Sequence, residues 1–138
     1  MTTPSDLHAA ALAQLRTMAH VDVYDADVPD KPPADARGRV YPYVVLWPPS
    51  PGGNPFDPAL AEDSGGLTWT MQVTVAAGDV TWCMQTVTKV RDVLTGVQLA
   101  AGASRLTDGT PTSRTVMRDP DVTPHRWFVP LIFDCQIA

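Results

Sequence analysis

The 138-residue sequence predicts an α+β fold: a mostly antiparallel sheet with an N-terminal helix, a second helix packed on one face, and a long hairpin loop. Three observations carry this prediction. Apolar residues fall at every second position between residues 67 and 75, as in a strand with one buried face. From residue 80 they recur every third or fourth position, which is typical of an amphipathic helix. Residues 48–66 hold five prolines and four glycines, which favour a loop.

The N-terminal helix is expected over residues 1–19. Thr3 or Ser5 is a suitable N-cap, and Pro4 fits the first turn of a helix. The apolar side chains that share one face of this helix are Leu7, Ala11, Leu15 and Met18.

Two extended segments precede the loop. The sequence after residue 20 alternates before its prolines begin, and residues 39–47 are rich in Val and Tyr, which favours a strand. Pro42 cannot donate a ladder hydrogen bond, so it should lie at the beginning of that strand or at an edge. In the 48–66 loop the large apolar side chains are Phe56 and Leu60, which we treat as candidate anchors for a partner.

The strand beginning at residue 67 leads directly into the second helix. Gly78 turns the chain, Asp79 is a suitable N-cap, and Gly96 is well placed to end the helix. The apolar stripe of the helix comprises Val80, Cys83, Val87, Val90 and Leu94. We expect one core cluster that includes Trp69, Val73, Val87, Val90, Leu94 and Phe133.

The last strand alternates over eleven residues, from Trp127 to Ile137. Its inward residues include Cys135, so both Cys83 and Cys135 should be buried free thiols. Pro130 suggests a bulge or an edge position. The opposite face carries Phe128 and Ile132, which make it a candidate interface because an apolar edge invites a neighbour. Trp82 lies off the helix stripe and is a further interface candidate.

Length, charge and composition restrict the class of protein. The chain suits one domain over residues 1–138, and no apolar run is long enough for a membrane helix. The N-terminus lacks the pattern of a signal peptide, and two cysteines in apolar patterns fit a reducing cytosol. The net charge is -5, and its excess acid lies in residues 1–70, which argues against binding of duplex DNA.

Motifs for catalysis are missing, so no catalytic, cofactor-binding or metal-ligating residue is assigned. The best catalytic candidate is residues 118–128, where Asp119, Asp121 and His125 could bind a divalent ion or share a proton. The competing interpretation is a turn, because aspartate beside proline often hydrogen-bonds its own backbone. A small metal-dependent enzyme and a small-molecule binding domain with Trp82 over a pocket remain alternative functions.

The order of elements and several local phrases resemble a known family. The phrases are "YPYVVL" before a Pro/Gly-rich loop, "WTMQVTVAAGD" leading into "VTWCMQTVTKVRDVLTG", and the closing "MRDPDVTPHRWFVPLIFDCQI". Over residues 20–138 the chain resembles the tail terminator (tail completion) proteins of long-tailed bacteriophages, particularly those that infect actinobacteria. Head–tail connector or stopper proteins are similar in size and style and form the main alternative.

The resemblance implies a structural virion protein without cofactors. Such a subunit would assemble in the host cytoplasm as a ring homo-oligomer, a hexamer in the family. The ring would cap the tail tube, stop its growth and dock the head, at the head-proximal end of the tail. Its partners would be further copies of itself, the tail tube protein and the head–tail connector protein. DNA would pass through without specific binding, and no membrane is involved.

Overall fold

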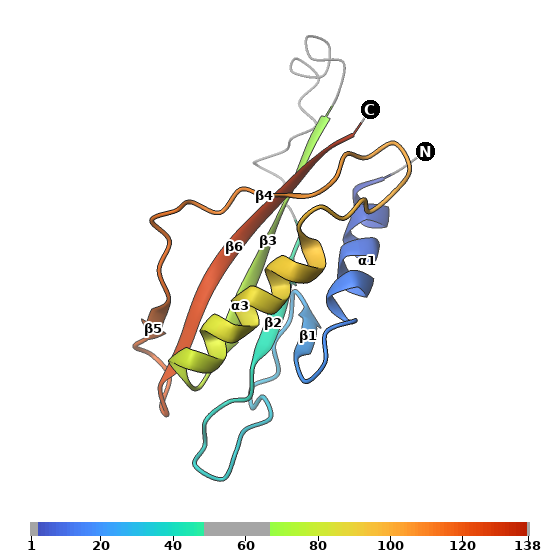
Figure 1. The fold of residues 1–138 in the computed structure, drawn as a ribbon. Helices are drawn as coiled ribbons and strands as arrows, with labels where there is room; N and C mark the ends of the chain where they lie inside the picture. The colour runs from blue at the N-terminus through green and yellow to red at the C-terminus, as the bar shows by residue number, and fades with distance from the viewer. Residues whose placement is uncertain (1–2, 49–66, 138) are drawn as a thin grey trace.

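The computed structural model describes residues 3–48 and 67–137 (Figure 1). In this part of the chain two helices pack on a mixed sheet of six strands, most of them antiparallel, which confirms the predicted α+β class. No helix in the described ranges is long and apolar enough to cross a membrane. The elements in chain order are α1 (Pro4–Leu15), β1 (Asp22–Asp25), β2 (Tyr43–Trp47), β3 (Leu67–Ala77), α3 (Val80–Leu94), β4 (Thr107–Asp108), β5 (Met117–Asp119) and β6 (Arg126–Ile137).

The sheet is built around its two longest strands. The strand order is β1-β2-β3-β6-β4, and β5 also pairs with β6. β3 and β6 are antiparallel along their length, from Leu67 opposite Ile137 to Ala77 opposite Trp127. β1 runs parallel to β2 at one end of the sheet, while β4 and β5 occupy the other end. Both helices cover the same face, where their buried residues join one core cluster.

Helix α1 begins as predicted and ends earlier than predicted. The Thr3 hydroxyl accepts a hydrogen bond from the Asp6 backbone, and the Asp6 carboxylate accepts one from the Thr3 backbone, which forms a capping box. Leu7, Ala11 and Leu15 are fully buried. The expected helix over residues 1–19 is too long, because Arg16 is the C-cap and the chain then turns to His20, whose φ is 61°.

The strand predicted over residues 39–47 is also shorter in the structure. β2 begins directly after Pro42, in agreement with the expectation that this proline lies at the strand's start. Before it, the Tyr41 backbone N–H donates to the Pro33 carbonyl and so belongs to the preceding loop. β2 and β3 are antiparallel neighbours, so residues 48–66 connect the strands of a hairpin. Residues 49–66, with Phe56 and Leu60, lie outside the described ranges.

A close backbone contact fixes the turn from β3 into α3. The Gly78 N–H donates to the Val40 carbonyl at 2.8 Å, and a Cβ atom at Gly78 would lie 2.5 Å from the Val40 nitrogen. Asp79 caps α3, with its carboxylate accepting from the backbone N–H groups of residues 81 and 82. Gly96, with φ +80°, follows the helix as predicted.

The buried stripe of α3 differs from the predicted one at two positions. Cys83, Val90 and Leu94 are fully buried, and Val87 packs against the core. Val80, predicted to face inward, is 39% exposed, because it begins the helix at the end of the buried stripe. Thr86 is buried instead, and burial is acceptable because its hydroxyl donates to the Trp82 carbonyl.

The predicted core cluster is confirmed. Five of its six residues are fully buried and the sixth, Val87, packs against them. Both Cys83 and Cys135 are buried free thiols, as expected.

Pro130 lies in a strand with neighbours on both sides, but at a gap in the pairing. β5 pairs with β6 at residues 126–128 and β4 pairs at residues 133–134. The Ile132 N–H points to that side, where it donates to the Thr110 hydroxyl, and residues two apart in a strand point the same way. The missing N–H of Pro130 therefore faces the gap, so the expected edge position is confirmed locally.

Candidate functional site

The outer face of the sheet, opposite the helices, is partly covered by the chain itself. Near β2 a small cluster is formed by Val40, Tyr43, Val45 and Ala76, and Phe128 packs against it. A hollow of about 190 Å³ opens beside Phe128. Part of the predicted interface on β6 is therefore occupied within the subunit.

Arg126 and Tyr43 form the polar rim of this hollow. The Arg126 guanidinium donates to the Tyr43 hydroxyl at 3.1 Å and lies 5.7 Å from the centre of the tyrosine ring. Burial raises the pKa of Tyr43, and the guanidinium only partly opposes this shift. Tyr43 is therefore a neutral hydroxyl at physiological pH.

Ile132 lies farther along the same face of β6 and is half-buried. Its strand partner on β3 is Gln72, and the next outward residue on β6 is Asp134. Phe128, Pro130 and Ile132 therefore share this face of β6, and the polar Gln72 and Asp134 lie beside Ile132.

Trp82 lies on the helix-covered side of the sheet and packs within the subunit. Tyr41 stacks on its ring at 6.2 Å between centroids, and the Arg39 guanidinium lies 4.6 Å from the ring centroid. Arg39 is held by Asp35 at 2.9 Å and approaches Asp79 at 3.7 Å. The half-buried indole of Trp82 thus contacts the loop before β2 and holds it against the beginning of α3.

A groove of about 270 Å³ runs beside α3, on the side away from α1. Residues 109–116 connect β4 to β5, and both of these strands pair with β6. We call this segment the arch, because it bows away from the sheet (Figure 1). The groove lies between α3 and the arch. Its lining residues are Met84, Val87, Thr88, Arg91, Thr110, Arg114, Val116, Val129 and Leu131.

Charged side chains stand at the rim of this groove. Arg91 donates to Asp108 at 2.8 Å at the start of the arch, whereas Arg114 has no ion-pair partner within the described residues. Met84 on α3 is 58% exposed beside them. The groove therefore combines an apolar floor with positive charge.

The aspartates and histidine considered for catalysis form a turn. The Asp119 carboxylate accepts a hydrogen bond from the Asp121 backbone N–H at 3.0 Å, as the competing interpretation expects. His125 is exposed. Across the described ranges, no group of three His, Cys, Asp or Glu side chains is arranged to hold a metal ion.

The sequence of the chain matches the family model described as Tail completion protein gp17 over residues 5–132. The chain belongs to this family. None of the curated proteins matches it. A tail completion protein is a structural component of the phage tail, so the arrangement of its surfaces is the feature to explain.

In this tail completion protein the predicted interface residues do not gather in one place. Phe128 and Ile132 lie on the outer face, Trp82 lies on the opposite face, and Phe56 and Leu60 lie outside the described ranges. The groove was not predicted from the sequence, because Arg91 and Arg114 line it together only as a result of the fold of the arch. The sequence contains Arg91, Arg114 and Met84, but their spacing forms no motif.

Proposed function

We propose that this tail completion protein forms a ring that caps the tail tube, ends tube polymerisation and presents the surface that docks to the head. Membership of the tail completion family over residues 5–132 is the observation that carries the proposal. The ring would be a homo-oligomer, a hexamer as the resemblance implies. Its other partners would be the tail tube protein and the head–tail connector protein, and DNA would pass through without specific binding.

Two features of the structure support a ring. The two ends of the sheet differ, with β1 at one end and β4, β5 and the arch at the other. A subunit with two different lateral surfaces can join its copies head to tail, and such contacts close into a ring when the rotation allows. The half-buried Ile132 on the outer face offers a further contact for the tube or for a neighbour.

Infection by a phage that lacks the gene for this protein tests the proposed function. Without the gene product, tube growth lacks its stop, so electron micrographs should show tails of irregular length that carry no heads. Supplying the protein should restore uniform tails and head attachment. Purified protein should bind the head-proximal end of purified tails. Uniform tails without the protein, together with binding to heads only, would favour a connector or stopper instead.

A further inference from the structure

One end of the sheet carries concentrated negative charge. We call residues 22–30 the acidic edge, because β1 and the loop after it hold Asp22, Asp25, Asp27 and Asp30 and no basic residue. All four aspartates are exposed. Asp25 bonds to the His8 ring at 2.6 Å, whereas the other three have no ion-pair partner among the described residues. At least three carboxylates are therefore free to meet a partner.

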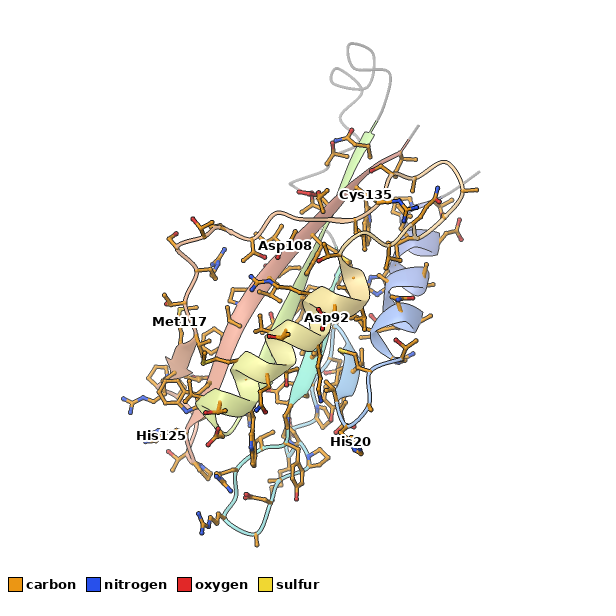
Figure 2. The ribbon with its side chains drawn as sticks, viewed as in Figure 1. His20, Asp92, Asp108, Met117, His125 and Cys135 are labelled. Carbon is orange, nitrogen blue, oxygen red and sulfur yellow. The ribbon has the colours of Figure 1, made fainter. Side chains whose placement is uncertain are left out.

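The opposite end of the sheet carries unpaired positive charge. Arg114 in the arch and Arg118 in β5 are exposed and form no ion pair within the described ranges, while the neighbouring Asp119 is half-buried. Met117 of β5 and His20, which precedes β1, stand on opposite sides of the molecule in Figure 2. The strand order likewise places β1 at one end and β5, which pairs with β6, toward the other.

We infer that the acidic edge of one copy docks against the groove and arch of the next copy. This contact deepens the proposed ring and rests on it. Arg114 and Arg118 would face the aspartates, while the exposed Ala26 and Pro29 between those aspartates would meet Met84. Because the two surfaces lie at opposite ends of one sheet, each copy would use both, as a head-to-tail ring requires.

Charge also disfavours the alternative pairing of like surfaces. Among the described strands β1 pairs with β2 alone, so its other side could pair with its counterpart in a second copy. Two acidic edges would then bring eight carboxylates together, and like charges in close contact oppose association. The same aspartates that repel an identical edge attract a surface carrying arginines, so they select the heterologous contact.

Charge reversal and its rescue test this contact. Asp27→Arg and Arg114→Asp should each raise the protein concentration for half-assembly by about tenfold or more, measured by sedimentation in low salt. The double variant restores an opposite pair and should recover most of the loss. Asp92→Arg is the matched control, because Asp92 is exposed on α3 with no ion-pair partner among the described residues, and it should assemble normally (Figure 2).

Cross-linking in assembled tails gives a second readout that does not depend on assembly in solution. The native Cys83 and Cys135 are buried, so Asp27→Cys with Arg114→Cys places two accessible thiols per copy. A short bismaleimide should convert these tails into a ladder of covalent multimers. Each single-cysteine variant can form at most dimers, and Asp92→Cys with Arg114→Cys should give no ladder.

The outcomes separate this contact from the proposed ring. Normal ring assembly by both charge-reversal variants would overturn the contact but not the proposed ring. A ladder from the Asp92–Arg114 cysteine pair alone would do the same. A wild-type protein that stays monomeric and gives no ladder from any pair in tails would overturn both. Loss in each single variant with recovery in the double variant, accompanied by the Asp27–Arg114 ladder, would establish the contact.

Discussion

Cys83 and Cys135 show how the core determines the chemistry of single side chains. Cys83 is fully buried and Cys135 is 3% exposed. Burial raises the pKa of the Cys83 thiol to about 11, and burial with the neighbouring Asp134 carboxylate raises the pKa of Cys135. Because the thiolate is the reactive form, both burial and the raised pKa should slow modification.

We therefore expect both thiols to resist labelling in the native protein. At pH 8 a thiol with a pKa of about 11 is ionised in only about one molecule in a thousand. A chromogenic disulfide reagent should react with two thiols per chain in urea and with almost none in native buffer over the same time. Rapid native labelling of both would show that the core is open.

Asp108, the last residue of β4, forms an ion pair with Arg91 and so connects the chain before the arch to α3. Burial raises its pKa, but hydrogen bonds from Thr110 and the Arg91 guanidinium outweigh burial, so the net pKa lies below the ordinary value of 3.8. A carboxyl with a lowered folded pKa stabilises the fold above its unfolded pKa. That contribution is lost as the pH falls through the folded pKa.

Asp108→Asn should therefore destabilise the protein in a pH-dependent manner. The cost at pH 7 should reach at most about 1 kcal/mol, because the ion pair is partly exposed to solvent. As the pH falls below about 4, wild type loses the same contribution and the two unfolding curves should converge. Urea unfolding at both pH values measures this, and an equal deficit at each would mean that charge is not the cause.

The unit formed by β3, Gly78 and α3 is the element on which the rest of the fold is assembled. β3 buries Trp69 and Val73 on the face that α3 covers, and Leu94 closes the far end of the helix stripe. The two elements meet at one glycine, so both the packing and the turn can be tested by single substitutions.

Leu94→Ala should lower the free energy of unfolding by about 2–5 kcal/mol, because it removes a fully buried side chain and leaves a cavity. Met84→Ala on the exposed side of α3 is the control and should cost much less. Chemical denaturation measures both. A cost below about 0.5 kcal/mol for Leu94 would contradict the packing of α3 on the sheet.

Gly78→Ala should be costly for a steric reason. The new Cβ would meet backbone atoms of Arg39 and Val40 at 2.7 and 2.5 Å, and backbone cannot move aside as a flexible side chain can. We expect a loss of about 1–3 kcal/mol or more. Gly96→Ala is the comparison, since its Cβ would enter open space and only its φ of +80° opposes the change, at about 1–2 kcal/mol. A smaller loss at Gly78 than at Gly96 would show that the loop before β2 yields easily.

Local patterns predicted the elements that carry a sequence period. The alternation in β3 and β6 and the spacing in α3 identified these elements and most of their buried residues, including Leu94 and Phe133. The ends of the elements were predicted less accurately, as Val80 and the end of α1 show. At an end the buried face stops, so the apolar pattern no longer marks which residues belong to the element. The two-residue β4 has no period, and parallel pairing of β1 with β2 depends on contacts that no local pattern records.

At the scale of the whole molecule, the candidate site depends on topology. The outward direction of Phe128 and Ile132 on β6 was predictable from alternation, whereas their use as an interface stays a prediction. The acidic run was visible in the sequence, but its position opposite Arg114 was not, because it follows from the strand order. Trp82 was predicted as an interface candidate, whereas its contacts with Arg39 and Tyr41 come from a loop whose path the sequence does not indicate.

Ile132→Asp tests the outer face in assembly. The side chain is half-buried beside polar neighbours and Asp134, so an added carboxylate should leave the subunit folded. We expect a melting temperature within a few degrees of wild type, because a change at a half-exposed site usually costs little, together with failure to cap tails in micrographs. Gln85→Asp, an exposed change on α3 and away from this face, is the control. Normal capping by the Ile132 variant would remove this part of β6 from the interface.

The position of β6 in the sheet also determines when the protein can fold during its synthesis. β6 is made after every other described element, yet it lies between β3 and the short strands β4 and β5. Its partner β3 leaves the ribosome about fifty residues earlier and must wait with α3 beside it, since pairing distant segments is slow. Until β6 emerges, the apolar face of α3 lacks Phe133 and Leu131 as cover. Nascent chains should therefore expose an apolar surface that molecular chaperones bind, and the native subunit should appear only once β6 has been translated.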